Sequence, residues 1–183
     1  MLITLNNLIT AAMLAEGEIS CERDNGHTLI VPLSRSKWSF LKRYIEEQAS
    51  HSLTYSSIDE ELIIAQKSLE EAYKLWYVEN NKVFTKKLNN PLLTEECIIL
   101  LIALFGSRKI ESISFNTTIK KDYLLSLCHS LSTVLNTPIL PGHSAIKIID
   151  IKHVIPAIIQ TQPYYYSTEL FKYVTISELK KSN

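Results

Sequence analysis

The chain has 183 residues, of which 46% are hydrophobic, so it can form one domain or two small similar halves with a shared core. Nineteen Lys and Arg residues balance nineteen Asp and Glu residues, and this neutral charge argues against a histone-like or tail-driven nucleic-acid binder. The three cysteines are widely spaced without a CxxC pair and support neither a zinc site nor a disulfide scaffold. The apolar run from Cys97 to Phe105 is too short to span a bilayer, which takes about 20 residues, and no membrane association is expected.

The first half of the sequence predicts helices and hairpins in the order α-β-β-α-β-β-α. Thr4 can cap a first helix, whose apolar residues recur at helical spacing, and Gly17 ends it. Asn25-Gly26 predicts a tight hairpin, because these residues accept the positive φ that such turns need. The expected elements are helix 4–15, strands 18–22 and 28–33, helix 37–48, strands 52–57 and 61–66, and helix 68–79.

A polar connection rich in Lys and Asn, residues 80–91, is the best internal boundary. The order of elements then recurs, with the first hairpin truncated and with Thr94 as the cap of the leading helix. We therefore expect an α+β fold of two halves related by a pseudo-twofold axis, 1–90 with the linker and 91–183 with a C-terminal tail, the second half being reduced. The expected elements here are helix 95–105, strand 110–116, helix 118–135, strand 144–149 and a helix beginning near Lys152.

Two nearly all-apolar segments, 9–17 and 98–106, hold equivalent places in the two halves. Each ends in a glycine, which is the usual C-cap of a helix. Their small residues allow two helices to approach closely. Taken alone, this pattern indicates two packed core helices and no chemistry.

Four segments carry a more specific pattern. Segment 15–20 reads Ala-Glu-Gly-Glu-Ile-Ser, segment 29–41 runs from an apolar strand into a helix, segment 69–91 combines a tyrosine-rich helix with Lys82, and segment 104–117 begins Leu-Phe-Gly-Ser-Arg. In this order and at this spacing, they resemble the LAGLIDADG homing endonucleases of organellar introns. The resemblance implies two signature helices at a pseudo-twofold axis and a saddle of sheets that lies along nucleic acid.

In that family the last acidic residue of each signature helix binds a divalent metal, and two metals drive phosphodiester cleavage. Here the first acid aligns with Glu16 and the second with Phe105, which cannot bind metal. Since one carboxylate is half of such a site, the expected protein is not an enzyme, and Glu16 is a catalytic relic. Mg²⁺ would be a cofactor only of residual endonuclease activity, with Glu16 as its ligand and Glu18 or Glu111 as a displaced second acid.

Basic residues cluster locally despite the neutral total, and each cluster is either a nucleic-acid contact or a solvated face. The segment from Lys82 to Lys87 is the most attractive cluster, because it lies in a polar connection with Asn neighbours. The candidate nucleic-acid-binding residues are Arg35, Lys37, Lys82, Lys86, Lys87, Arg108 and Lys109.

The lost acid and the neutral charge favour a catalytically inactive protein that binds structured RNA within an organellar ribonucleoprotein, a mitochondrial ribosome or an intron-splicing complex. Its expected partners are RNA and neighbouring proteins of that assembly, and a free homodimer is not expected. The habitat of the family and an AT-rich-looking composition favour a mitochondrial location. Two alternatives stay open: a site-specific DNA endonuclease with an altered metal site, and a purely protein–protein structural module.

Overall fold

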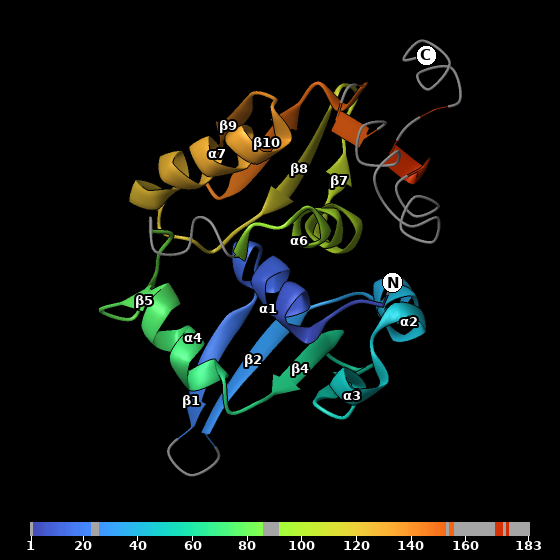
Figure 1. The fold of residues 1–183 in the computed structure, drawn as a ribbon, viewed down its shortest axis with the longest axis vertical. Coiled ribbons are helices and arrows are strands. Elements are labelled where there is room, and N and C mark those ends of the chain that lie inside the picture. The colour runs from blue at the N-terminus through green and yellow to red at the C-terminus, as the bar shows by residue number, and fades with distance from the viewer. Residues whose placement is uncertain are drawn as a thin grey trace.

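Two four-stranded antiparallel sheets, one from each half of the chain, enclose a pair of central helices, α1 and α6 (Figure 1). The computed structural model describes residues 2–22, 26–85, 92–152, 154–155, 171–173 and 175. The first sheet has the strand order β1-β2-β4-β3 and the second has the order β7-β8-β10-β9. Because these orders are equivalent, the two halves repeat one topology, as the sequence predicts. The strands are β1 (Glu18–Glu22), β2 (Gly26–Pro32), β3 (Leu53–Ser56), β4 (Glu61–Ala65), β7 (Ser107–Arg108), β8 (Ser112–Asn116), β9 (Ile139–Pro141) and β10 (Ala145–Ile149).

The central helices begin at the threonines that the sequence predicts as caps. The backbone N–H of Asn7 donates to the Thr4 hydroxyl at 3.4 Å, and that of Cys97 donates to the Thr94 hydroxyl at 3.1 Å. The Asn7 side chain also donates to Glu96 Oε2 at 2.6 Å, which joins the two N-termini. The helices are α1 (Leu5–Leu14) and α6 (Glu95–Leu100), and α6 continues as the π-helical turn η2 (Leu101–Phe105).

The prediction of one continuous helix over residues 37–48 is wrong, because the helix is broken at Ile45. Ile45 is extended (φ −70°, ψ 144°) and pairs in parallel with Ile3, whose N–H donates to the Tyr44 carbonyl at 2.7 Å. This pairing with a residue more than forty positions away interrupts the helical hydrogen bonds, and local periodicity cannot show it. The resulting helices are α2 (Arg35–Tyr44) and α3 (Glu47–Ser50).

The expected helix 68–79 ends earlier, at Trp76, because Tyr77 is extended and opens a short hairpin. The first hairpin of the second half is truncated as predicted, because β7 has two residues where β1 has five; β9, a strand that the sequence does not predict, has three. The remaining elements are α4 (Leu69–Trp76), β5 (Tyr77–Val78), β6 (Asn81–Lys82), α7 (Lys121–Leu135) and the 3₁₀ turn η3 (Phe171–Tyr173).

One continuous apolar core lies between the sheets and the central helices. Alternate strand residues such as Leu29, Val31, Leu62 and Ile64 face this core and are fully or almost fully buried. The opposite face of each sheet is thereby turned outward, and its composition decides what it can bind. In the part of the chain that the structure describes, no helix is long and apolar enough to cross a membrane.

Candidate half-sites at the ends of the central helices

The C-terminal ends of α1 and η2 hold Glu16 and Phe105 in equivalent positions, each directly before a glycine. A Cβ on Gly106 would lie 2.4 Å from the carbonyl oxygen of Ile102, and one on Gly17 would lie 2.8 Å from a backbone oxygen of α1. Both glycines are therefore required by close backbone approach. The same helix ending is built twice, once with a carboxylate and once with a phenyl ring.

At the first half-site, the buried ammonium of Lys82 closes the end of α1. Its Nζ donates to the Ala15 carbonyl at 3.0 Å and to the Gly17 carbonyl at 2.7 Å, and it lies 3.9 Å from Glu18 Oε1. A cation suits this place, because the carbonyl end of a helix carries partial negative charge. Burial lowers the pKa of Lys82 to about 8, and the charges of Glu18 and Glu16 oppose that change.

The acid that could replace the missing ligand, Glu18, is engaged elsewhere. The Tyr77 hydroxyl donates to Glu18 Oε2 at 2.5 Å and accepts the Ile19 N–H at 3.0 Å. Burial and the bond to Glu18 raise the pKa of Tyr77. Glu111 forms an exposed ion pair with Lys152 at 3.8 Å. Neither acid stands in for Phe105 at the end of η2.

At the second half-site, two side chains from distant parts of the chain close the end of η2. The Tyr173 hydroxyl donates to the Gly106 carbonyl at 2.9 Å, and the Lys37 ammonium donates to the Ala103 carbonyl. Lys37 Nζ also lies 3.4 Å from the Tyr173 hydroxyl and 5.9 Å from the centre of its ring. Tyr173 thus donates a hydrogen bond to the carbonyl of Gly106 in the second half, as Lys82 does to the carbonyl of Gly17 in the first.

These residues do not fit a pair of divalent metals. Phe105 offers no oxygen ligand, and the carbonyls beside it already accept hydrogen bonds. At the first half-site, Glu16 shares its surroundings with the Lys82 ammonium. Among the described residues, no group of three His, Cys, Asp or Glu side chains could hold a metal ion.

The outward face of the two sheets, here called the saddle face, is poor in cations. Pairing registers place its residues on alternate strand positions, opposite the buried ones. Lys147 is the single cation among its described side chains, while Glu18 and Glu61 are acidic. This face therefore offers phosphates little attraction. Its members are Glu18, Ser20, Thr28, Ile30, Pro32, Thr54, Ser56, Glu61, Ile63, Ala65, Ser107, Ser112, Ser114, Asn116, Leu140, Ala145, Lys147 and Ile149.

The sequence-predicted cations do not gather at one place. Arg35 and Lys109 are exposed, whereas the ammonium groups of Lys37 and Lys82 bond to the two helix ends. Arg108 is half-buried and donates to the Ile110 carbonyl at 3.2 Å. Two further predicted contacts, Lys86 and Lys87, lie outside the described residues.

Tyr173 is the site residue that the sequence analysis missed. It lies 67 positions from Gly106 in a tail without helical or strand periodicity, so no local signal marks it. Lys82 was predicted as a nucleic-acid contact because it begins the basic segment from Lys82 to Lys87, but only 3% of this residue is exposed. Both residues act on backbone carbonyls, which a sequence does not display.

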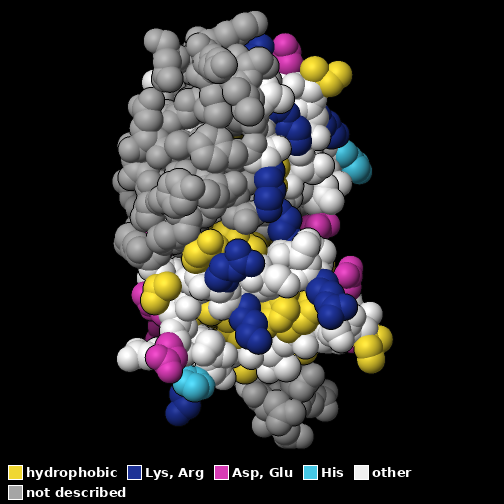
Figure 2. Space-filling view, turned by 90° about the vertical axis from the view of Figure 1, so that its right-hand side faces the viewer, with side chains coloured by type: hydrophobic (Ala, Val, Ile, Leu, Met, Phe, Trp, Pro, Cys, Tyr) yellow, Lys and Arg dark blue, Asp and Glu magenta, His cyan; other side chains and the backbone are white. Residues whose placement is uncertain are grey.

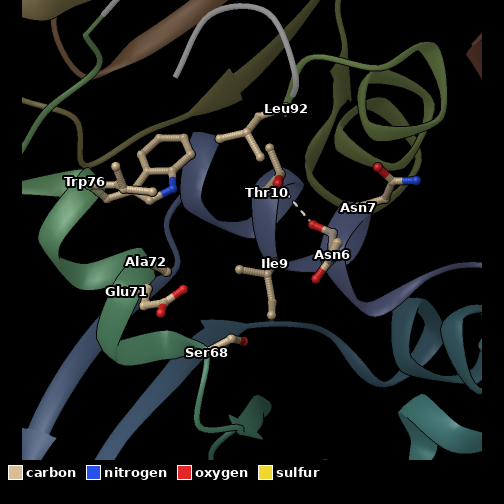
Figure 3. Close-up of a pocket in the computed structure, with 10 residues that line it drawn as sticks. Asn6, Asn7, Ile9, Thr10, Ser68, Glu71, Ala72, Trp76 and Leu92 are labelled. Carbon is tan, nitrogen blue, oxygen red and sulfur yellow. Dashed lines mark hydrogen bonds between the residues drawn. The ribbon is translucent and has the colours of Figure 1, made fainter. Parts of the chain in front are cut away.

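A separate pocket of about 330 Å³ lies between α1 and α4, where the Thr10 hydroxyl donates to the Asn6 carbonyl at 2.9 Å (Figure 3). Of the described residues that line it, Glu71 alone is charged. A phosphate group would meet no cation there, so this pocket is not the nucleic-acid site. Its lining consists of Asn6, Asn7, Ile9, Thr10, Ser68, Glu71, Ala72, Leu75, Trp76 and Leu92.

Solved structures similar to this chain are homing endonucleases. The homing endonuclease I-WcaI, bound to its DNA recognition sequence, matches with a TM-score of 0.60 at 11% identity, covering 97% of this chain and 85% of that one. I-SmaMI, bound to an uncleaved DNA target in the presence of calcium ions, matches with a TM-score of 0.50 at 10% identity, covering 97% and 96%. The I-LtrWI LAGLIDADG homing endonuclease, bound to target DNA, matches with a TM-score of 0.46 at 13% identity, covering 97% and 95%.

Protein-family models and curated proteins yield no match to this sequence. The structural matches extend over nearly the whole chain and include both halves. The protein therefore has the α+β fold of the LAGLIDADG homing endonucleases, and the resemblance drawn from the sequence is confirmed at the level of the fold.

Proposed function

We propose that this protein uses a homing-endonuclease fold to bind structured RNA without cleaving it, as a structural component of a mitochondrial ribosome or an intron-splicing complex. The observation that carries the proposal is the second half-site. Its acid is replaced by Phe105, and its carbonyls are closed by Lys37 and Tyr173. Electrostatic stabilisation is often the largest contribution to such catalysis, so the loss of one metal position should cost several kcal/mol.

Nucleic acid is the ligand class that the fold suggests, since I-WcaI and I-SmaMI are described as bound to DNA. Duplex DNA carries one negative charge per about 1.7 Å of its axis, and proteins hold it mainly through phosphate contacts. A neutral chain with one described cation on its saddle face is poorly suited to that ligand. Structured RNA is recognised more by shape, and neighbouring proteins of an assembly would share the contacts.

The test is an affinity purification of the tagged full chain from its native source, followed by RNA sequencing and mass spectrometry. We expect organellar RNA together with its proteins: ribosomal RNA for a ribosomal component, or an intron transcript for a splicing component. Recovery of proteins without RNA would contradict the proposal and favour the protein–protein module.

A cleavage assay separates the enzyme alternative. Purified protein is incubated with Mg²⁺ and the genomic DNA of its source, beside Glu16→Gln and heat-treated protein. We expect the three samples to give the same background of nicks. Mg²⁺-dependent cleavage by the wild type that Glu16→Gln abolishes would establish an endonuclease and overturn the proposal.

A further inference from the structure

The largest unpaired group of cations on one described helix lies on α2, outside the saddle face. Arg35, Ser39, Lys42 and Arg43 recur at helical spacing and are all exposed, while Phe40 on the opposite side is buried in the core. The helix contains no Asp or Glu. On the side of the molecule where α2 lies, Lys and Arg side chains gather in the middle of the face and acidic side chains lie toward its margins (Figure 2).

None of these three charges is neutralised by a carboxylate within the described part of the chain. Among the described residues, Arg35, Lys42 and Arg43 form no ion pair with a carboxylate, and Arg43 lies 5.9 Å from the centre of the Tyr44 ring. Lys42 and Arg43 suit the last turn, where a helix favours cations. Arg35 occupies the first turn, where the helix dipole opposes a cation, so helix stability alone does not account for the row.

We infer that the exposed face of α2, formed by Arg35, Lys42 and Arg43, binds the phosphate backbone of the RNA, so that the nucleic acid contacts this flank and not the saddle face. The inference rests on the proposed function and names the surface that performs it. At a rise of about 1.5 Å per residue, the row is about 12 Å long and spans about three phosphates of one strand.

The composition of this face favours phosphates over an acidic protein. Arginine and lysine are typical donors to phosphate oxygens. Protein interfaces are anchored by buried aromatic and apolar side chains at their centre. The exposed positions of α2 carry three cations and two serines, whereas its aromatic side chains Trp38 and Tyr44 are half-buried against the core.

The experiment that tests this inference measures how the affinity of the full chain for a fluorescent RNA stem–loop depends on salt concentration. Three phosphate contacts predict a slope of log affinity against log salt concentration of about −2 to −3. In the triple variant Arg35→Gln, Lys42→Gln, Arg43→Gln, we expect the slope to approach zero and the affinity in about 0.1 M salt to fall by roughly 100-fold. Circular dichroism confirms that each variant is folded.

Two controls locate the effect. The charge-matched variant Lys67→Gln, Lys120→Gln, Lys121→Gln removes three exposed cations outside α2, and Thr54→Glu adds an anion to the saddle face. We expect both to bind within about threefold of the wild type. An equal loss in the charge-matched variant, or a large loss only in Thr54→Glu, would overturn the inference.

The outcomes also separate this inference from the proposed function. A wild type that binds RNA while the α2 variant binds equally well refutes the inference alone. A wild type that binds no stem–loop and no RNA from its source refutes the proposed function and, with it, the inference. Equally tight binding of a DNA duplex that depends on α2 supports the surface and overturns the assignment of RNA as its ligand.

Discussion

Replacing Lys82 by methionine tests the account of the first half-site. The change keeps a long unbranched side chain but removes the ammonium that donates to the carbonyls of Ala15 and Gly17. The Ala15 carbonyl still accepts the Thr118 N–H at 3.3 Å, but the Gly17 carbonyl loses its Lys82 donor in a buried place, which costs about 1–3 kcal/mol. We expect the free energy of unfolding to fall by that amount at pH 7.

The pH dependence is the sharper part of this prediction. The pKa of Lys82 is lowered to about 8 in the folded chain, against about 10.4 for an unfolded lysine. Between these values the unfolded chain binds more protons than the folded one, so the contribution of Lys82 to stability rises with pH. From pH 7 to pH 9 the rise is about 1.3 kcal/mol, and Lys82→Met lacks it.

Other buried groups act in the opposite direction at high pH. Burial raises the pKa of Cys128 to about 11 and also raises that of Cys97, so the unfolded chain loses these protons first and stability falls above about pH 9. Both groups are common to wild type and variant. The difference between the two proteins therefore isolates Lys82.

The assay is urea unfolding at 25 °C, repeated at several pH values between 7 and 9 at constant ionic strength. The stability difference between wild type and Lys82→Met should widen by about 1.3 kcal/mol over this interval. Lys67→Met, a change at an exposed lysine, is the control for the loss of one surface charge. Parallel curves for wild type and Lys82→Met would refute the reasoning.

Three further predictions concern the second half-site and its helix, and urea unfolding measures each of them. Tyr173→Phe leaves the Gly106 carbonyl without its hydroxyl donor and should lower the free energy of unfolding by about 1 kcal/mol. Because Lys37 contacts Tyr173, the loss in the double variant with Lys37→Met should differ from the sum of the two single losses by about 0.5 kcal/mol or more. Strictly additive losses would contradict that contact. Gly106→Ala forces a Cβ against the Ile102 carbonyl and should lower the free energy of unfolding by about 2 kcal/mol or more. An unchanged stability would show that the backbone of Gly106 does not lie this close to the Ile102 carbonyl. Thr94→Ala removes the side-chain cap of α6 and should lower the free energy of unfolding by about 1 kcal/mol. A variant as stable as the wild type would show that this cap does not stabilise the protein.

The sequence by itself determined the repeated order of helices and sheets, because the signals for it are local. The threonine caps at Thr4 and Thr94 and the glycines at the helix ends act within one turn of backbone. The same signals placed Glu16 and Phe105 at equivalent positions, which is the core of the functional proposal. The fold followed from these features even though I-WcaI and I-SmaMI, whose fold it matches, are only 11% and 10% identical in sequence.

Elements that depend on distant partners could not be predicted in this way. The break between α2 and α3 comes from the pairing of Ile45 with Ile3, and the two-residue strands are too short to show an alternation. Their hydrogen bonds are made to segments that the chain brings together only when it folds.

The chemistry at the helix ends was likewise decided by tertiary structure. Lys82 reaches carbonyls 65 and 67 residues away, and Tyr173 reaches one 67 residues away. A composition shows that the net charge is zero, but strand register and burial decide which face carries the cations. Because the field at a surface depends on where charges lie and not on their sum, only the folded chain separates the cation-poor saddle face from the basic face of α2.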